Sequence, residues 1–177
     1  MKVIFNPAIA LMSSVRYPIK FAIVFMVIFM ALVVAGIRLV TPINAEIALL
    51  ESERVGLSYI RSVRLPMESI QQHRGMMAAY FDGATEFRER FMEKRRVVDK
   101  ALEQLKLKDT ELGEQLETKG LVNDLFDQWN RIKKSNLDTG KSETVAAHTD
   151  MINDMLALIV TVADSSQITL DPKLDSY

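Results

Sequence analysis

The chain of 177 residues contains no cysteine, only two histidines, seven glycines and five prolines. Without cysteine it can form neither disulfides nor thiolate metal sites, and it offers no cysteine nucleophile. Two histidines alone are a weak metal signal, because a zinc site usually takes roughly three or four protein ligands. We therefore expect no metal and no cofactor. Long runs without glycine or proline favour helices over strands.

Acidic residues are absent from residues 1–41, where the four charged side chains are Lys2, Arg16, Lys20 and Arg38. Subtracting these four from the 22 basic residues leaves 18 basic and 23 acidic residues in 42–177, a net charge of −5. A nucleic-acid partner would need a dense basic face, so we expect none. The chain also lacks a Gly-rich phosphate loop, an HExxH motif and a Ser/His/Asp pattern, and we predict that it is not an enzyme.

An uncharged run, FAIVFMVIFMALVVAGI, fills residues 21–37 between Lys20 and Arg38. As a helix it is ~26 Å long, and flanking apolar residues extend it toward the ~30 Å thickness of a bilayer core. The alternative is a cleaved signal peptide, whose apolar region normally has ~7–15 residues and ends at a small-residue site. The longer run favours an uncleaved transmembrane helix over residues 19–40, with the lipid bilayer as a partner.

Charge sets the expected orientation, because basic flanks stay in the cytoplasm. The chain then divides into a cytoplasmic N-terminus (1–18), the membrane helix, a periplasmic helical domain (41–165) and a turn (166–177) that leads to a missing C-terminal part. The expected location is the inner membrane.

Apolar residues beyond the membrane helix recur mostly at steps of three or four, which is the helical spacing. This pattern predicts four amphipathic helices over residues 42–82, 85–107, 110–136 and 142–164. We expect a kink at Pro66, an end at Gly83 and a short corner at residues 108–110. Asp109 or Thr110 would cap the third helix and Ser142 the fourth. Short connections between such helices indicate an all-α fold, an antiparallel four-helix bundle.

Both histidines fall on or beside an apolar stripe. His73 lies ~14 Å below the membrane-distal turn of the first helix, and His148 lies ~9 Å below its own turn. Since the first and fourth helices are neighbours in a bundle, we expect the two histidines to come close. Arg74, Gln71 and Thr149 add polar groups, and the arginine fork suits a planar anion. Two interpretations remain open: a ligand pocket, or a polar layer that fixes helix register.

A basic cluster, Lys94, Arg95 and Arg96, has acidic neighbours at helical spacing. This pattern is typical of a solvated, salt-bridged face.

Three segments carry a resemblance: QQHRGMMAAYFDG, AHTDMINDML and VADSSQITLDPKLDSY. The chain resembles the N-terminal part of methyl-accepting chemotaxis receptors, and Gln71, Arg74 and Gly75 are similar to the pattern in nitrate- and nitrite-sensing helical domains. The resemblance implies that a basic residue faces the anion. It also implies a second membrane helix, a HAMP linker and a signalling domain beyond this chain, so we expect the chain to be a fragment.

The leading hypothesis is therefore the ligand-sensing input region of a transmembrane chemoreceptor, which binds a small, anionic molecule and forms a homodimer. The alternatives are the input domain of a histidine kinase or a diguanylate cyclase, or a membrane-anchored scaffold without a ligand.

Overall fold

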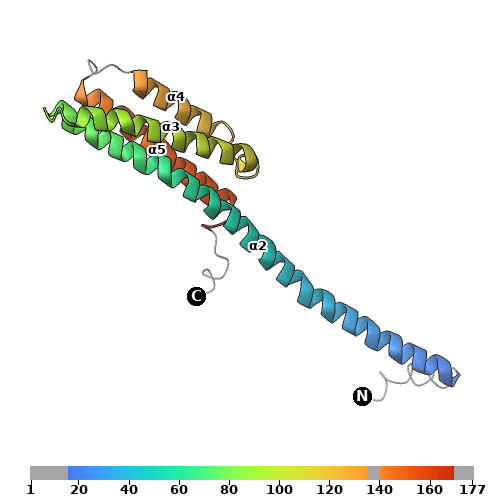
Figure 1. Cartoon of the computed structure of the whole chain (residues 1–177). Helices are drawn as coiled ribbons and strands as arrows, with labels where there is room; N and C mark the ends of the chain where they lie inside the picture. The colour runs from blue at the N-terminus through green and yellow to red at the C-terminus, as the bar shows by residue number, and fades with distance from the viewer. Residues whose placement is uncertain (1–15, 135–139, 170–177) are drawn as a thin grey trace. The chain divides into compact units, whose positions relative to one another are not determined.

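The computed structural model describes residues 16–134 and 140–169, and in these two ranges every regular element is a helix. The helices are α2 (Tyr17–Phe81), α3 (Phe87–Leu112), α4 (Leu121–Lys134) and α5 (Lys141–Ser165). Figure 1 shows their order along the chain. The all-α prediction is confirmed.

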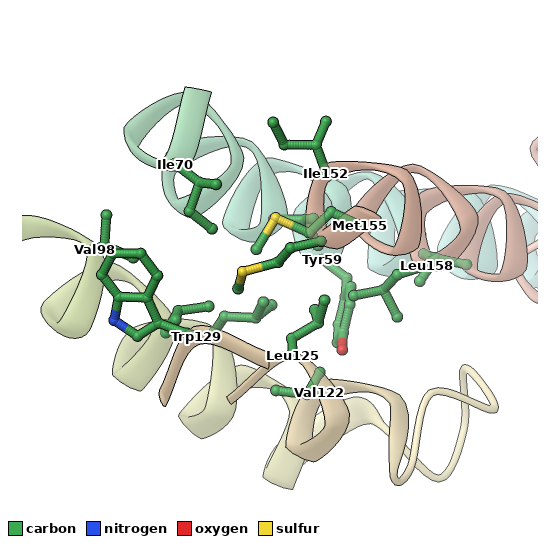
Figure 2. Close-up of a cluster of buried hydrophobic side chains, with 14 of the residues drawn as sticks. Tyr59, Ile70, Val98, Val122, Leu125, Trp129, Ile152, Met155 and Leu158 are labelled. Atoms are coloured by element: carbon green, nitrogen blue, oxygen red, sulfur yellow. The ribbon is translucent and has the colours of Figure 1, made fainter. Parts of the chain in front are cut away.

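The chain divides into two compact units, Met1–Ala48 and Leu49–Tyr177. In the second unit, the C-terminal part of α2 runs beside α3, α4 and α5 in alternating directions (Figure 1). All four helices contribute buried side chains to one core, including Tyr59, Leu102, Leu125 and Met155. Figure 2 shows how side chains from the facing helices meet. This is the antiparallel four-helix bundle that the spacing predicts.

The first unit contains the apolar N-terminal part of α2. Its most apolar stretch has no buried residue, and Phe21, Phe25 and Phe29 are 75%, 72% and 59% exposed. By length and composition, α2 is one of two described helices that could cross a membrane, and α5 is the other. However, α5 buries Met151, Met155 and other side chains in the bundle core, which accounts for its apolar composition.

The helix α2 ends where the sequence predicts, just before Gly83. Gly83 adopts a positive φ of 99°, and the Ala84 N–H bonds to the Ala79 carbonyl while the Gly83 N–H bonds to the Tyr80 carbonyl. These two bonds form a Schellman motif, which a glycine in the left-handed region permits. The predicted helix end is confirmed. No break accompanies Pro66, which is buried within the continuous helix.

The predicted corner at residues 108–110 is wrong, because α3 continues to Leu112 and the chain turns between Gly113 and Gly120. Asp109 does not cap α4. Its carboxylate accepts hydrogen bonds from the Tyr59 and Thr118 hydroxyls, over 2.6 Å for Tyr59. These tertiary partners satisfy the carboxylate inside α3 and link that helix to α2.

The predicted cap of the last helix is also wrong. Gly140 is the N-cap of α5, so Ser142 lies in the first helical turn. The end expected for α4, at Asn136, lies outside the described residues. The observed end of α5, Ser165, is one residue beyond the predicted one.

Gly56 permits a close approach between α2 and the end of α5. A Cβ atom at this position would lie 2.1 Å from the Ser166 Oγ atom, well inside van der Waals contact. The absence of a side chain therefore sets how closely α2 packs against Ser166 and Ile168.

Candidate functional site

The two histidines meet in the bundle core, as the helix lengths predict. The His73 Nδ1 atom of α2 lies 2.7 Å from the His148 Nε2 atom of α5. Both side chains are fully buried. The rings stack with their centroids 5.0 Å apart and their planes 25° from parallel.

Hydrogen-bond partners fix the protons on this pair. The His148 Nδ1 atom lies 2.6 Å from the Thr144 carbonyl oxygen, and since a carbonyl can only accept, His148 carries its proton on Nδ1. Neutral His148 then accepts at Nε2, so His73 donates from Nδ1. These hydrogen bonds leave the His73 Nε2 atom with a lone pair that can accept, and within residues 16–134 and 140–169 that buried atom has no hydrogen-bond partner.

Aromatic rings enclose His73. Its ring contacts Trp129 edge to face with the centroids 5.1 Å apart, and it contacts Phe91 at 5.9 Å. Burial, with smaller contributions from His148 and Arg95, lowers the pKa of His73 to about 3. Burial also lowers the pKa of His148, although the hydrogen bond to the Thr144 carbonyl opposes this. At neutral pH both histidines are therefore uncharged.

Arg74 reaches from α2 to α5 beside the histidines. Its Nη1 atom donates a hydrogen bond to the Thr149 hydroxyl over 3.0 Å, and that hydroxyl donates in turn to the Val145 carbonyl. A guanidinium has five N–H donors, so Arg74 keeps donors for a further partner. Its charge is close enough to His148 to lower the pKa of that histidine.

Arg95 belongs to the same cluster, and the expectation that the whole basic cluster forms a solvated face is wrong for this residue. Its guanidinium lies over the Phe91 ring, 5.7 Å from the centroid, and its buried Nε atom has no hydrogen-bond partner. Burial lowers the pKa of Arg95. Only Arg96 in this cluster is exposed, because Lys94 and Arg95 are half-buried.

The missed signal lies in the spacing of α3. The predicted stripe jumps seven residues from Phe91 to Val98, and Arg95 fills that gap at steps of four and three. It therefore occupies the buried face of the helix. A basic residue at such a position is a better candidate than its flanking cations.

The two arginines near the histidines form no ion pair with an acid in the part of the chain that the structure describes. The ion pairs that the structure gives for residues 16–134 and 140–169 involve Lys108, Lys119, Lys133 and Lys141, and neither Arg74 nor Arg95. The negative charge of Asp99 raises the pKa of Arg95, but the Asp99 carboxylate accepts its hydrogen bonds from the Trp129 indole and Lys133. Two guanidinium groups beside an uncharged histidine pair favour an anion.

The structure thus brings together four of the five predicted site residues: His73, Arg74, His148 and Thr149. Gln71 is exposed, and none of the hydrogen bonds of the described residues joins it to this cluster. A groove of about 780 Å³ lies elsewhere, between α4 and α5, and both acidic and basic side chains line it. Its mixed charge gives no preference for an anion.

A family model described as nitrate and nitrite sensing matches residues 67–177. The chain belongs to that family. The matched region contains the end of α2, all of α3, α4 and α5, and every residue of the histidine and arginine cluster. This is a sensor family, in line with a role other than catalysis. Comparisons with curated proteins and with solved structures find no match.

Proposed function

We propose that this chain is the extracytoplasmic input region of a transmembrane chemoreceptor, and that it binds nitrate or nitrite at the cluster of Arg74, Arg95 and the two histidines. The observation that carries the proposal is the pair of guanidinium groups beside the buried histidines that form no ion pair with a carboxylate among the described residues. Membership of the nitrate and nitrite sensing family supports the choice of anion.

Binding at this place would act on helix packing. Arg74 belongs to α2 and bonds to α5 through Thr149, so an anion that draws on its free donors changes the balance of contacts between these helices. Packed helices respond to such changes by small shifts between discrete arrangements. Since α2 also carries the apolar segment of residues 21–37, a shift in α2 has a route to the membrane.

Calorimetry on the full chain in detergent micelles tests the proposal. Sodium nitrate and sodium nitrite should each give a saturable heat with one site per chain, whereas sodium chloride and sodium acetate at the same ionic strength should give weaker binding. If all four salts behave alike, the family's ligands are not recognised here. A chain that binds none of them would favour the alternative of a scaffold.

The output class is a separate part of the proposal. A chemoreceptor, a histidine kinase and a diguanylate cyclase can share one input domain, because fold and input do not determine the output. The coding sequence downstream of residue 177 distinguishes them. A methyl-accepting signalling domain there would support the chemoreceptor, and a kinase or cyclase domain would support the corresponding alternative.

The proposed orientation places residues 1–18 in the cytoplasm and the bundle in the periplasm, because the basic, acid-free flank precedes the membrane helix. A periplasm-active reporter fused after residue 177 should be active in cells. The matched cytoplasm-active reporter at the same point should be silent, and the reverse pattern would invert the topology.

We also propose a homodimer in which α2 lies at the seam. In the bundle part of α2, Leu50, Leu57 and Leu65 remain 57%, 48% and 49% exposed at intervals of seven and eight residues, which places them on one face. Pairing of this face would remove apolar surface from water.

Single cysteines along residues 43–64 should therefore crosslink between copies with a helical period, most strongly at Leu50 and Leu57, the two of these leucines that lie in that range. Cysteine at Tyr59 or Val63, whose side chains are buried in the bundle, should crosslink poorly. Crosslinks without any period, or none at all, would argue for a monomer.

A further inference from the structure

Two buried polar atoms at this site, one on His73 and one on Arg95, are hydrogen-bonding groups of opposite kind. Among the residues that the structure describes, the His73 Nε2 atom is a buried acceptor without a donor, and the Arg95 Nε atom is a buried donor without an acceptor. Both flank Phe91: its ring centroid lies 5.9 Å from the His73 ring centroid and 5.7 Å from the central guanidinium carbon of Arg95. A buried polar group without a partner is unfavourable, so a ligand that satisfies both groups gains from each.

A bare anion can satisfy only one of them. Its oxygen atoms accept from the Arg95 Nε–H, but they cannot donate to the lone pair of His73. Two lone pairs pointed at each other repel, unless a proton lies between them. The complementary species is therefore an anion together with one proton, held between an anion oxygen and the His73 Nε2 atom.

We propose that the ligand anion binds against Arg95 and takes up one proton at the His73 Nε2 atom, so that the chain binds anion and proton together. This inference rests on the proposed function. It assigns Arg95 as an anion contact and His73 as the proton acceptor, whereas His148 positions His73 by accepting a hydrogen bond from its Nδ1 atom. The proton comes from solvent, and no covalent bond is made or broken apart from those to that proton.

The charged groups around His73 fit this role. Those that face the pair are Arg74 of α2, Arg95 and Asp99 of α3, Lys133 of α4 and His148 of α5. The single acid among them, Asp99, already accepts from the Trp129 indole and Lys133. Without an anion, burial keeps His73 neutral, with smaller contributions from His148 and Arg95. An anion beside His73 acts in the opposite direction, since an opposite charge nearby favours the charged histidine.

The direction of the pH dependence follows from linkage. The pKa of His73 lies at about 3 without ligand, and a bound anion raises it. Affinity therefore falls as pH rises, by about tenfold per pH unit between the two pKa values. Stability without ligand has the opposite trend, because the unfolded chain binds a proton near pH 6.5 that the folded core rejects. Weak acid thus destabilises the free bundle while it strengthens anion binding.

Nitrate calorimetry on the full chain, at a fixed pH, in two buffers that differ in heat of protonation, measures the protons taken up per anion bound. The wild type should take up about one proton at pH 5.5, and Kd should rise about tenfold from pH 5.5 to pH 6.5. His73→Gln should bind nitrate without proton uptake and with a Kd that is independent of pH, because the glutamine amide is a permanent neutral donor. Circular dichroism on the same sample checks that the variant is folded.

Arg95→Ala should weaken nitrate binding at least tenfold while proton uptake per bound anion persists. Arg96→Ala, which removes the exposed neighbouring charge, should change neither. Nitrate binding with no proton exchange and a constant Kd in the wild type would overturn this inference and leave the proposed function standing. Absence of any nitrate or nitrite binding at either pH would overturn both.

Discussion

Replacing Arg74 with alanine is expected to weaken nitrate binding by about ten- to a hundredfold. A hydrogen bond to a charged group contributes roughly 1.5–3 kcal/mol, and about 1.4 kcal/mol corresponds to one factor of ten in Kd. Arg74 uses one donor on Thr149 and has no ion pair with an acid among the described residues. Arg74→Lys should recover only part of the affinity, because an ammonium group lacks the planar fork.

Calorimetry and circular dichroism on the same samples separate the two interpretations of this residue. Arg88→Ala, at an exposed position in the first turn of α3, is the matched control and should bind nitrate as the wild type does. If Arg74→Ala keeps both its helicity and its affinity, the anion site lies elsewhere. If helicity collapses, the side chain is structural and the polar-layer interpretation of the histidines is correct.

The meeting of His73 and His148 was predictable from sequence because it depends on regular geometry. Each histidine sits at a core position of its own helix, and the fixed rise per residue gives its distance from the connecting turn. Antiparallel neighbours then bring the two rings to a similar depth in the bundle. The tautomers were not predictable, because they depend on the hydrogen bond between His148 Nδ1 and the Thr144 carbonyl. No sequence pattern shows which side chain that carbonyl accepts from.

The charge pattern of residues 94–96 and the helical repeat of α3 give opposite predictions for Arg95. Three successive cations with acidic neighbours look like a solvated face, and for Arg96 that interpretation is correct. The position of Arg95 between Phe91 and Val98 outweighs its charge, since the helix repeat alone decides which side chain faces the core. A gap of seven in an apolar stripe is thus a place to look for a buried polar residue.

The turn after α3 was misplaced for a different reason. A Lys-Asp-Thr sequence has the composition of a helix cap, and the local signal is real. A tertiary contact outweighs this local preference, because the Asp109 carboxylate accepts a hydrogen bond from the Tyr59 hydroxyl, 50 residues earlier in the chain. Burial, together with the same hydrogen bond, raises the pKa of the Tyr59 hydroxyl, which keeps it a donor to Asp109. Local propensities cannot include a partner so distant in sequence.

Trp129→Ala is expected to destabilise the bundle by about 3–5 kcal/mol, the cost typical of removing a buried large aromatic side chain. The indole is only 1% exposed and belongs to the core cluster that joins all four helices. Its ring packs edge to face on His73, and its N–H donates to Asp99 over 2.7 Å. Truncation therefore leaves a cavity beside the histidine pair and removes a donor from Asp99.

Unfolding of the full chain in urea, with micelles present and helicity as the signal, measures this loss. Trp129→Phe should lose less than half as much, because phenylalanine keeps most of the packing and Asp99 retains the Lys133 ion pair at 2.6 Å. Leu107→Ala, at a position that is 73% exposed, should shift the free energy of unfolding by less than about 0.5 kcal/mol. If Trp129→Ala costs no more than Leu107→Ala, the indole does not support the wall of the histidine site, and the aromatic enclosure of His73 must be relaxed in solution.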